Sequence, residues 1–523
     1  MPKVSPTKNG CNKNLFNSFC TQPRSPEYIK DSEITSSLGR TLQESSLGTD
    51  YEDASKVYKD IRSQTEAWLS ESSNVNGLTK GQIAEHLQRL AGVPKTPKQT
   101  ATKQLHLYPL TQSIAQISSF VKLHNPWDPG KAVFEFLARG MTSPEKLKDL
   151  WIELANNWSV HLDTKGEDLS AEFFENAARN LLPEGKDPWA GEPKSIPETD
   201  QLVFLEKSAP FTIGSAPAES LAKDLQVLIK LQKQVTRTNW IAMLDGLLRV
   251  AIPACYLWCY HCTGNLKSFF QRSLQDECLK EEITQNEIFT QTNFKPLNHG
   301  AKDVGSLEDK IRKYIFDLNF CHTAFQWLQN NQIRAFDEWA DAESINNKSG
   351  LSGLHEILKS LNPNSKSSLR SELEDNQREL KRSEDAIVQK QRSWTKNTFE
   401  SLQYLLRQRS VVDQLGFDQS YWCKKVPRGS TSAKNDPWLL EPSDLNLSLF
   451  VHLAAHDENG IKLQNPTARR LRKHLQKYGY AITDDELSKG VTGNRLRRLG
   501  RVTDSSDAEG GMMLVSAFHG DVK

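Results

Sequence analysis

The stretch from Thr238 to Cys262 constrains this chain of 523 residues more than any other, because it is the most apolar segment. Apolar side chains occur on all sides of it, so a helix formed here must be surrounded by protein or by lipid. Asp245, Arg249 and Pro253 interrupt the run, and a charge in the middle of a bilayer is costly. The segment therefore predicts the central helix of a helical bundle rather than a membrane span.

Charge and cysteine usage narrow the class of protein. The chain has 66 Lys and Arg against 65 Asp and Glu, a formal net charge of +1. This balance argues against a protein that coats nucleic acid or membrane over its whole surface. The eight cysteines are mostly far apart in a long chain, which is not the pattern of a secreted disulfide framework. The first residues contain no apolar signal segment, so we expect a cytoplasmic protein without a membrane partner.

Proline, glycine and capping residues divide the chain into mainly α-helical parts. Ser143 followed by Pro144, for example, is an N-cap with proline at the first helical position, and it predicts an amphipathic helix through Trp158. The predicted parts are a disordered tail (1–50), an N-terminal helical domain (51–183), a linker with a short strand (184–216), a central helical domain (217–365), a long charged helix (366–410), a second linker (411–435) and a C-terminal module (436–523).

The long charged helix has half of a coiled-coil pattern. Leu373, Leu380, Ile387 and Trp394 are spaced by seven, but the intervening core positions of the heptad are polar. We therefore expect one long helix that packs along one side as an arm between domains, and favour this over a full parallel coiled coil.

The C-terminal module combines three helical segments with a hairpin. Capping and stop signals place helices at 443–455, 468–478 and 483–500, and the third begins with acidic residues that complement its dipole. Two β-capable runs follow, at 501–503 and 512–518, and a polar linker ending in two glycines joins them.

This order of elements resembles the winged-helix form of the helix-turn-helix, in which the third helix enters the major groove of DNA. Residues 461–501 contain eleven Lys and Arg and three acids, a charge of +8 that marks a phosphate-binding surface. The alternative is a protein-docking module whose cations are solvated. The residues predicted to contact nucleic acid are Arg469, Arg470, Lys473, Arg495, Arg497, Arg498 and Arg501.

One cysteine cluster has a spacing with chemical meaning. Cys255, Cys259 and Cys262 resemble the iron–sulfur loop of radical S-adenosylmethionine enzymes, but the flanking segments are helical where that family has βα units. On a helix these positions form one stripe, and a buried free cysteine behaves as a small hydrophobe. We favour core cysteines over a zinc site completed by His261 or Cys278, and over an iron–sulfur cluster.

Other catalytic signals are weak or missing from the sequence. It contains no phosphate-binding P-loop, no dinucleotide-binding glycine motif after a strand and no H-E-x-x-H. His452 and His456 have a metal-compatible spacing, but no third ligand is evident near them, so we favour ordinary core or surface histidines. We therefore predict no catalytic residue, no metal ligand and no cofactor.

Two function classes follow from these patterns. The layout of the last hundred residues resembles that of subunits encoded in bacterial anti-phage defence clusters, the Druantia type among them, which implies an accessory role beside a separate helicase or nuclease. The first class is therefore a non-enzymatic subunit of a multi-protein complex, a helical scaffold that binds DNA and positions other proteins. The second is a metal-dependent enzyme that uses Cys255, Cys259 and Cys262 to hold zinc or an iron–sulfur cluster.

Overall fold

The structure, a computed structural model, is mainly α-helical with short two-stranded sheets, as the sequence predicts. It describes residues 33–43, 63, 67, 93–94, 104–106, 129–141, 143–158, 216–275, 294–302, 307–336, 351–388, 394–407, 419–426, 437–505, 512–516 and 518. The helices are α2 (Glu33–Gln43), α6 (Pro129–Gly140), α7 (Pro144–Trp158), α9 (Ala216–Leu231), η3 (Gln232–Gln234), α10 (Arg237–Leu274), α12 (Leu307–Asn330), α14 (Leu351–Ser360), α15 (Pro363–Val388), α16 (Trp394–Leu406), α18 (Asp444–Ala455), α19 (Ala468–Lys477), α20 (Asp484–Ser488) and α21 (Val491–Arg498).

The described strands form four small sheets. β1 (Val93–Pro94) pairs with β2 (Gln104–His106), β3 (Leu297–Asn298) with β6 (Tyr480–Ala481), β4 (Cys423–Lys425) with β5 (Trp438–Leu440), and β7 (Val502–Asp504) with β8 (Met512–Leu514). Only the β3–β6 pair among them is parallel, and it joins segments from the middle and the end of the chain.

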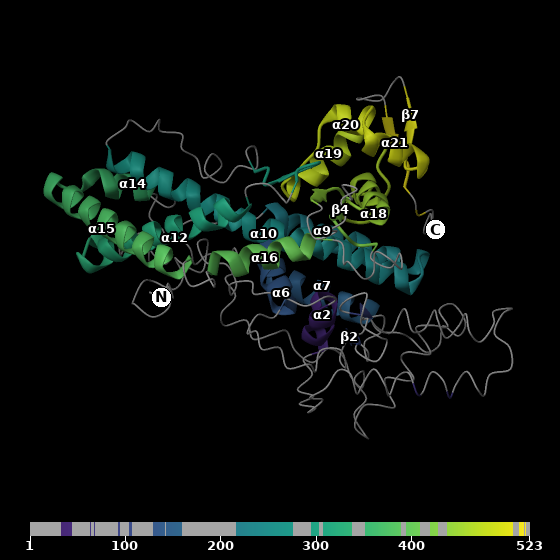
Figure 1. Ribbon diagram of the computed structural model, residues 1–523, viewed down its shortest axis with the longest axis horizontal. Helices are drawn as coiled ribbons and strands as arrows, with labels where there is room; N and C mark the ends of the chain where they lie inside the picture. Colours follow the sequence, from purple (N-terminus) through teal and green to yellow (C-terminus); the bar gives the residue numbers. More distant parts are fainter. Residues whose placement is uncertain are drawn as a thin grey trace, which may run out of the picture.

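Helix α10 is the central helix that the apolar stretch predicts. It begins after Thr236, whose side chain accepts a hydrogen bond from Asn239 N. By length and composition it could cross a membrane, but the whole of its most apolar 18-residue window is buried by protein. In Figure 1, α10 runs through the middle of the molecule, with α2, α6 and α7 on one side and the C-terminal helices α18–α21 on the other. It is the helix on which these parts meet.

The charges inside α10 have partners in the core. Arg249 lies 3.6 Å from Asp245, and both side chains are buried. Its Nε donates to Leu405 O at 2.6 Å, and its guanidinium also donates to Arg407 O. These carbonyls belong to the C-terminal end of α16, where cations are favourable and free acceptors need partners. Arg249, one of the charged residues that interrupt the apolar run, therefore attaches α16 to α10.

The N-terminal part has the predicted helix after Ser143. Ser143 Oγ accepts from Lys146 N at 3.3 Å, as an N-cap does. The helix is α7, and the residues predicted to form its apolar face are buried: Leu147, Leu150, Trp151, Leu154 and Trp158.

Helix α2 lies within the region predicted as a disordered tail. Its residues Ile34, Leu38 and Leu42 are buried, and it packs against α6, where Gly130 N donates to Ser37 Oγ at 2.9 Å. The apolar face of α2 is therefore part of the core. The polar composition of residues 1–50 did not indicate this helix. Most of residues 51–128 and all of 159–183 in the predicted N-terminal helical domain lie outside the described residues, as does nearly all of the predicted linker with its short strand (184–216).

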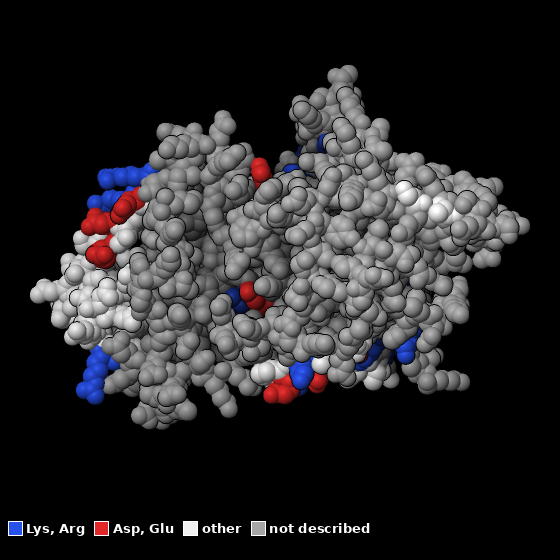
Figure 2. Space-filling model, turned by 90° about the horizontal axis from the view of Figure 1, so that it is seen from below, with Lys and Arg blue, Asp and Glu red and all other residues white. Residues whose placement is uncertain are grey.

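The charged helix α15 packs against α12 through a narrow apolar line. Leu369, Leu373 and Leu380 are buried, whereas most other described side chains of α15 are exposed. The side chains of Ile387 and Trp394 lie outside the described part. Figure 2 shows acidic and basic side chains next to one another at this end of the molecule. The predicted helix at 366–410 is described as two helices, α15 and α16, separated by residues 389–393.

The C-terminal module is fixed to the scaffold by residues 419–426, inside the predicted second linker. Trp422 is buried, and its Nε1 donates to Gly246 O of α10 at 2.8 Å. Asn446 of α18 is also buried and donates to Ser420 O at 3.0 Å. At Gly246 the two helices are so close that a Cβ would overlap the Asn446 amide. Glycine at this position therefore allows α18 to lie directly on α10.

Replacing Gly246 with alanine should weaken this contact. Overpacking a tight site costs about 1–3 kcal/mol, so the free energy of unfolding of the full chain should fall by an amount of that order in chemical denaturation. Gly264→Ala, in the same helix, is the control, because its added Cβ meets no atom nearer than 3.2 Å. Equal losses in the two variants would contradict the assigned role of Gly246.

Candidate nucleic-acid interface

The first two helices of the module begin and end where the sequence predicts. Ser443 Oγ accepts from Asn446 N at 3.1 Å at the start of α18. Helix α19 stops before Gly479, whose φ of 70° is in the left-handed region that favours glycine. Thr467 occupies the N-cap position of α19, but its side chain makes no capping hydrogen bond. Local sequence signals therefore set these helix boundaries, and the exception is the predicted side-chain cap at Thr467, which does not form.

The third predicted helix is two short helices. Thr483 Oγ1 caps α20 by accepting from Glu486 N at 3.1 Å, as predicted, but the helix ends after Ser488. Glu486 Oε1 then accepts from Thr492 N at 2.7 Å at the start of α21. A Cβ at Gly490 would overlap the Glu486 side chain. The prediction of one continuous helix over 483–500 was therefore wrong, and α20 and α21 form a helix–turn–helix pair.

The two strands of the predicted hairpin are present. β7 and β8 are antiparallel, with Thr503 opposite Met513. Val502, Met512 and Leu514 are buried, so one face of the hairpin packs on the module. Residues 506–511, between the strands, lie outside the described part.

A buried carboxylate connects the module to α9. Asp224 Oδ2 accepts from Tyr478 Oη at 2.7 Å and lies 2.9 Å from His474 Nε2. Burial raises the pKa of Tyr478, so its hydroxyl remains a donor. Asp224 is thus a second attachment of α19 to the scaffold, in addition to the contact of α18 with α10.

His299 connects the helix–turn–helix pair to β3. Its Nδ1 lies 2.6 Å from Tyr480 Oη, and its Nε2 lies 3.2 Å from Thr492 Oγ1 and 3.5 Å from Glu486 Oε1. Burial lowers the pKa of His299, although Glu486 and Glu441 oppose this shift. The neutral imidazole can therefore bridge hydroxyl groups on β6 and α21.

Arg495, a predicted nucleic-acid contact, is bound to acids within the protein. Its guanidinium donates to Glu441 Oε1 at 2.6 Å, to Asp444 Oδ1 at 2.5 Å and to Pro442 O at 3.0 Å. Its side chain is only 13% exposed. This arginine holds α21 against the start of α18.

Arg497 is also paired with a carboxylate. Its Nη2 lies 2.9 Å and its Nε 3.1 Å from Asp504 Oδ1 on β7, in a more exposed position. The pair connects α21 to the hairpin and gives Arg497 a carboxylate partner within the protein.

Four of the other predicted cations, Arg470, Lys473, Arg498 and Arg501, have no carboxylate partner among the described residues. Arg470 donates to Ala454 O at 2.7 Å and Arg501 to Ser448 Oγ at 3.0 Å, and both acceptors are neutral. Arg469 is exposed. Lys473 and Arg498 are exposed and form no ion pair with any residue that the structure describes. The structure thus pairs two of the seven predicted residues, Arg495 and Arg497, with carboxylates, and leaves four without such a partner in its described part.

Sequence reasoning missed part of this surface. Lys489, in the turn before α21, is exposed and has no ion pair among the described residues. Val491, at the start of α21, has 64% of its surface exposed. Asn494 is exposed one turn further along the same helix. The exposure of Val491 and Asn494 depends on how α21 packs, which the pattern of a single continuous helix did not indicate.

The charge of the folded module is lower than the sequence window suggested. Residues 437–505 contain eleven basic and eight acidic residues, a net charge of +3. Glu441, Asp444 and Asp504 lie outside the window 461–501, and the fold brings them to Arg495 and Arg497. The net positive charge of the folded module is therefore smaller than the +8 of the sequence window implies.

The cysteine cluster is a set of buried free thiols on α10. Burial raises the pKa of Cys255, Cys259 and Cys262, although Arg139, which donates to Cys259 Sγ at 3.5 Å, opposes the shift at Cys259. His261 lies 3.2 Å from the Asn265 amide instead of among the thiols. No group of three or more His, Cys, Asp or Glu side chains suited to a metal ion occurs in the described part of the chain, which does not include Cys278.

His452, in the last turn of α18, and His456, its C-cap, lie side by side. The centroids of their rings are 4.0 Å apart. Burial, helped by the neighbouring His456, lowers the pKa of His452 to about 3, and its Nδ1 lies 2.8 Å from Ser516 Oγ. His452 is thus a neutral core histidine that contacts the segment after β8.

Comparisons of the chain with protein-family models, with curated proteins and with solved structures found no match.

Removing Arg495 should affect stability far more than removing Arg498. Arg495→Ala deletes charge-assisted hydrogen bonds to Glu441 and Asp444, and such bonds contribute roughly 1.5–3 kcal/mol. Arg498→Ala removes an exposed cation and should change the free energy of unfolding by less than about 0.5 kcal/mol. Urea unfolding of the two full-length variants measures the difference. Equal effects would show that Arg495 does not hold α21 in place.

Proposed function

We propose that the chain is a non-enzymatic subunit that binds duplex DNA through the C-terminal module, residues 436–523, and that the helical scaffold holds this module in place. The observation that carries the proposal is a set of exposed cations without carboxylate partners in the described structure: Lys473 on α19, Lys489 in the turn between α20 and α21, and Arg498 on α21. Such cations are available to replace the counterions of a phosphate backbone.

The outer face of α21 suits contact with base edges. Val491, Asn494 and Arg498 occur at i, i+3 and i+7, and so lie along one stripe of the helix. Asparagine can pair with adenine, arginine with guanine, and an apolar side chain can contact the methyl group of thymine. The resemblance of the module to a winged helix supports the same orientation of α21.

The predicted arginines have different roles in this proposal. Arg495 and Arg497 orient α21, because internal carboxylates already bind them. Arg469, Arg470 and Arg501 add positive charge beside the stripe, and Arg498 contacts the duplex directly. Backbone contacts of this kind position a protein on DNA, whereas the stripe on α21 would provide discrimination between sequences.

The wider role follows from the resemblance in layout to accessory subunits of bacterial anti-phage defence systems. In that setting the chain is a cytoplasmic component of a multi-protein complex, and a separate helicase or nuclease performs the reaction. The alternative of a metal enzyme at Cys255, Cys259 and Cys262 is less favoured, because burial keeps these thiols protonated, whereas metal ligation needs thiolates.

Removing the available cations should weaken DNA binding in a salt-dependent manner. In the full chain, Lys473→Ala, Lys489→Ala and Arg498→Ala together should make the slope of log affinity against log salt shallower by about 2 to 3, since each phosphate contact contributes about 0.9. Fluorescence anisotropy with a labelled duplex at several salt concentrations measures this slope.

A matched control exists on α15. Arg378, Lys381 and Arg382 are exposed at the opposite end of the scaffold, and their triple alanine variant removes the same charge. Its slope should equal that of the wild type. Equal slopes for all three proteins, or no binding by the wild type, would refute the proposed DNA contact.

A further inference from the structure

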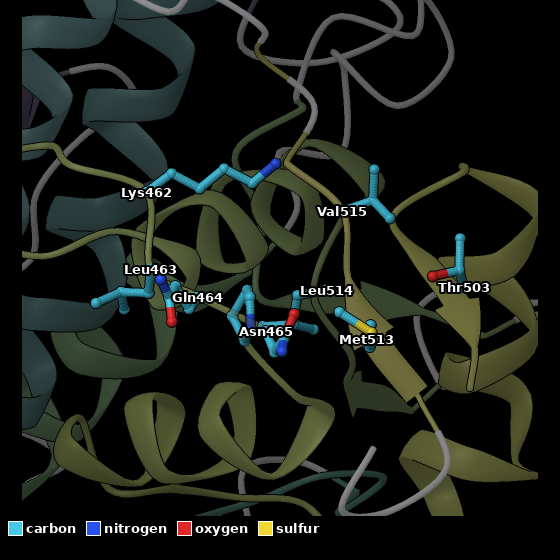
Figure 3. Close-up of a pocket in the computed structure, with 9 residues that line it drawn as sticks. Lys462, Leu463, Gln464, Asn465, Thr503, Met513, Leu514 and Val515 are labelled. Atoms are coloured by element: carbon cyan, nitrogen blue, oxygen red, sulfur yellow. The ribbon is translucent and has the colours of Figure 1, made fainter. Parts of the chain in front are cut away.

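A pocket of about 400 Å³ lies between the hairpin and the loop that precedes α19. Figure 3 shows Lys462 extended along one side of it and Met513 and Thr503 on the hairpin at the other side. Its lining residues are Lys462, Leu463, Gln464, Asn465, Pro466, Thr503, Met513, Leu514 and Val515.

The pocket opens on the outer face of the hairpin. Thr503 and Met513 are cross-strand partners, and their side chains alternate with the buried Val502, Met512 and Leu514. Met512, on the inner face, is the residue that Arg497 of α21 contacts, at 3.5 Å from its Sδ. The pocket and α21 are therefore on different faces of the hairpin, and the pocket needs an explanation other than the proposed DNA contact.

The pocket has both apolar and polar lining residues and an exposed apolar neighbour in the chain. Its apolar lining residues are Leu463, Pro466, Met513, Leu514 and Val515. Ile461, next to Lys462 in the chain, has 64% of its surface exposed. A single exposed apolar side chain is ordinary, but one next in the chain to the lining of a partly apolar pocket adds apolar surface that a bound ligand could cover.

The charge at the pocket is positive. Lys462 is exposed, and no acidic side chain lines the pocket. The neighbouring acids have other partners: Asp457 Oδ1 accepts from Ile461 N at 2.8 Å, Glu458 pairs with Lys223 at 3.6 Å, and Asp504 pairs with Arg497 at 2.9 Å. The surface is therefore complementary to a ligand that is both apolar and acidic.

We propose that this pocket is a docking site for an extended segment of a partner protein that carries an acidic residue close to a large apolar residue. The apolar side chain of the partner enters between Leu463 and Met513 and covers Ile461. Its carboxylate pairs with Lys462. A DNA backbone would use Lys462 but would leave the apolar surface exposed, which favours a peptide as the occupant.

Selection from a random peptide library tests this inference without a known partner. Displayed peptides of roughly twelve residues, long enough in extended form to cross the pocket, are selected on the full-length wild type. We expect enriched peptides with Asp or Glu near a large apolar residue. Their affinity, measured with synthetic peptides, should fall at least about tenfold for Ile461→Ser and for Lys462→Glu. Both changes are at exposed positions, so the fold should be preserved.

Matched changes at the start of α21 and in the turn before it are the control. Val491→Ser and Lys489→Glu replace the same kinds of residue on the proposed DNA-binding face, and they should leave peptide affinity unchanged. A peptide whose acidic residue is changed to lysine should regain affinity for Lys462→Glu.

Two results would overturn the docking site. One is a selection without enrichment, or with peptides that bind Ile461→Ser and Lys462→Glu as well as the wild type. The other is that no peptide is selected and Lys462→Glu weakens duplex binding as much as Lys489→Glu does, which would assign the surface to nucleic acid. Loss of DNA binding by the wild type alone would refute the proposed function and not this inference.

Discussion

The close approach of α18 to α10 at Gly246 is the contact on which the position of the C-terminal module depends. Glycine leaves room for the buried Asn446 amide, which donates to the carbonyls of Ser420 and Tyr421. Leaving the buried NH2 group of Asn446 unpaired would be costly, so these hydrogen bonds favour one packing of α18 on the scaffold. Asp224 fixes α19 to α9 at a second point. Because of these attachments the module is part of the packed structure, and a partner of the scaffold would be held at a defined distance from whatever the module binds.

Electrostatics divides the basic residues of the module into two groups. Internal carboxylates bind Arg495 and Arg497, which therefore act in the packing of α21. Lys473, Lys489 and Arg498 form no ion pair in the described structure, and Lys462 lies at a separate apolar pocket. The two proposals therefore assign different surfaces of the module to different ligands, one to phosphate and base edges and the other to an acidic, apolar peptide.

Local signals in the sequence predicted local structure well. The apolar stretch from 238 to 262 predicted α10, and Ser443 and Thr483 predicted the starts of α18 and α20. The break between α20 and α21 was missed, because it depends on Glu486 turning to Thr492 N. The partners of Arg495 are 51 and 54 residues away, and His299 is 193 residues from Thr492, so periodicity and spacing could not indicate these contacts. The sequence could accordingly indicate which segment is rich in cations, but it could not indicate which of these cations the fold pairs with carboxylates.

Hydrogen–deuterium exchange of the full chain, with and without a duplex of roughly three helical turns, tests the central claim most directly. The account predicts slower exchange of backbone amides in the turn at Lys489 and in α21 when DNA is bound. Exchange in α15, at the far end of the scaffold, should not change. Unchanged exchange throughout the module at saturating duplex, or protection confined to the scaffold helices, would contradict the claim that DNA binds at the C-terminal module.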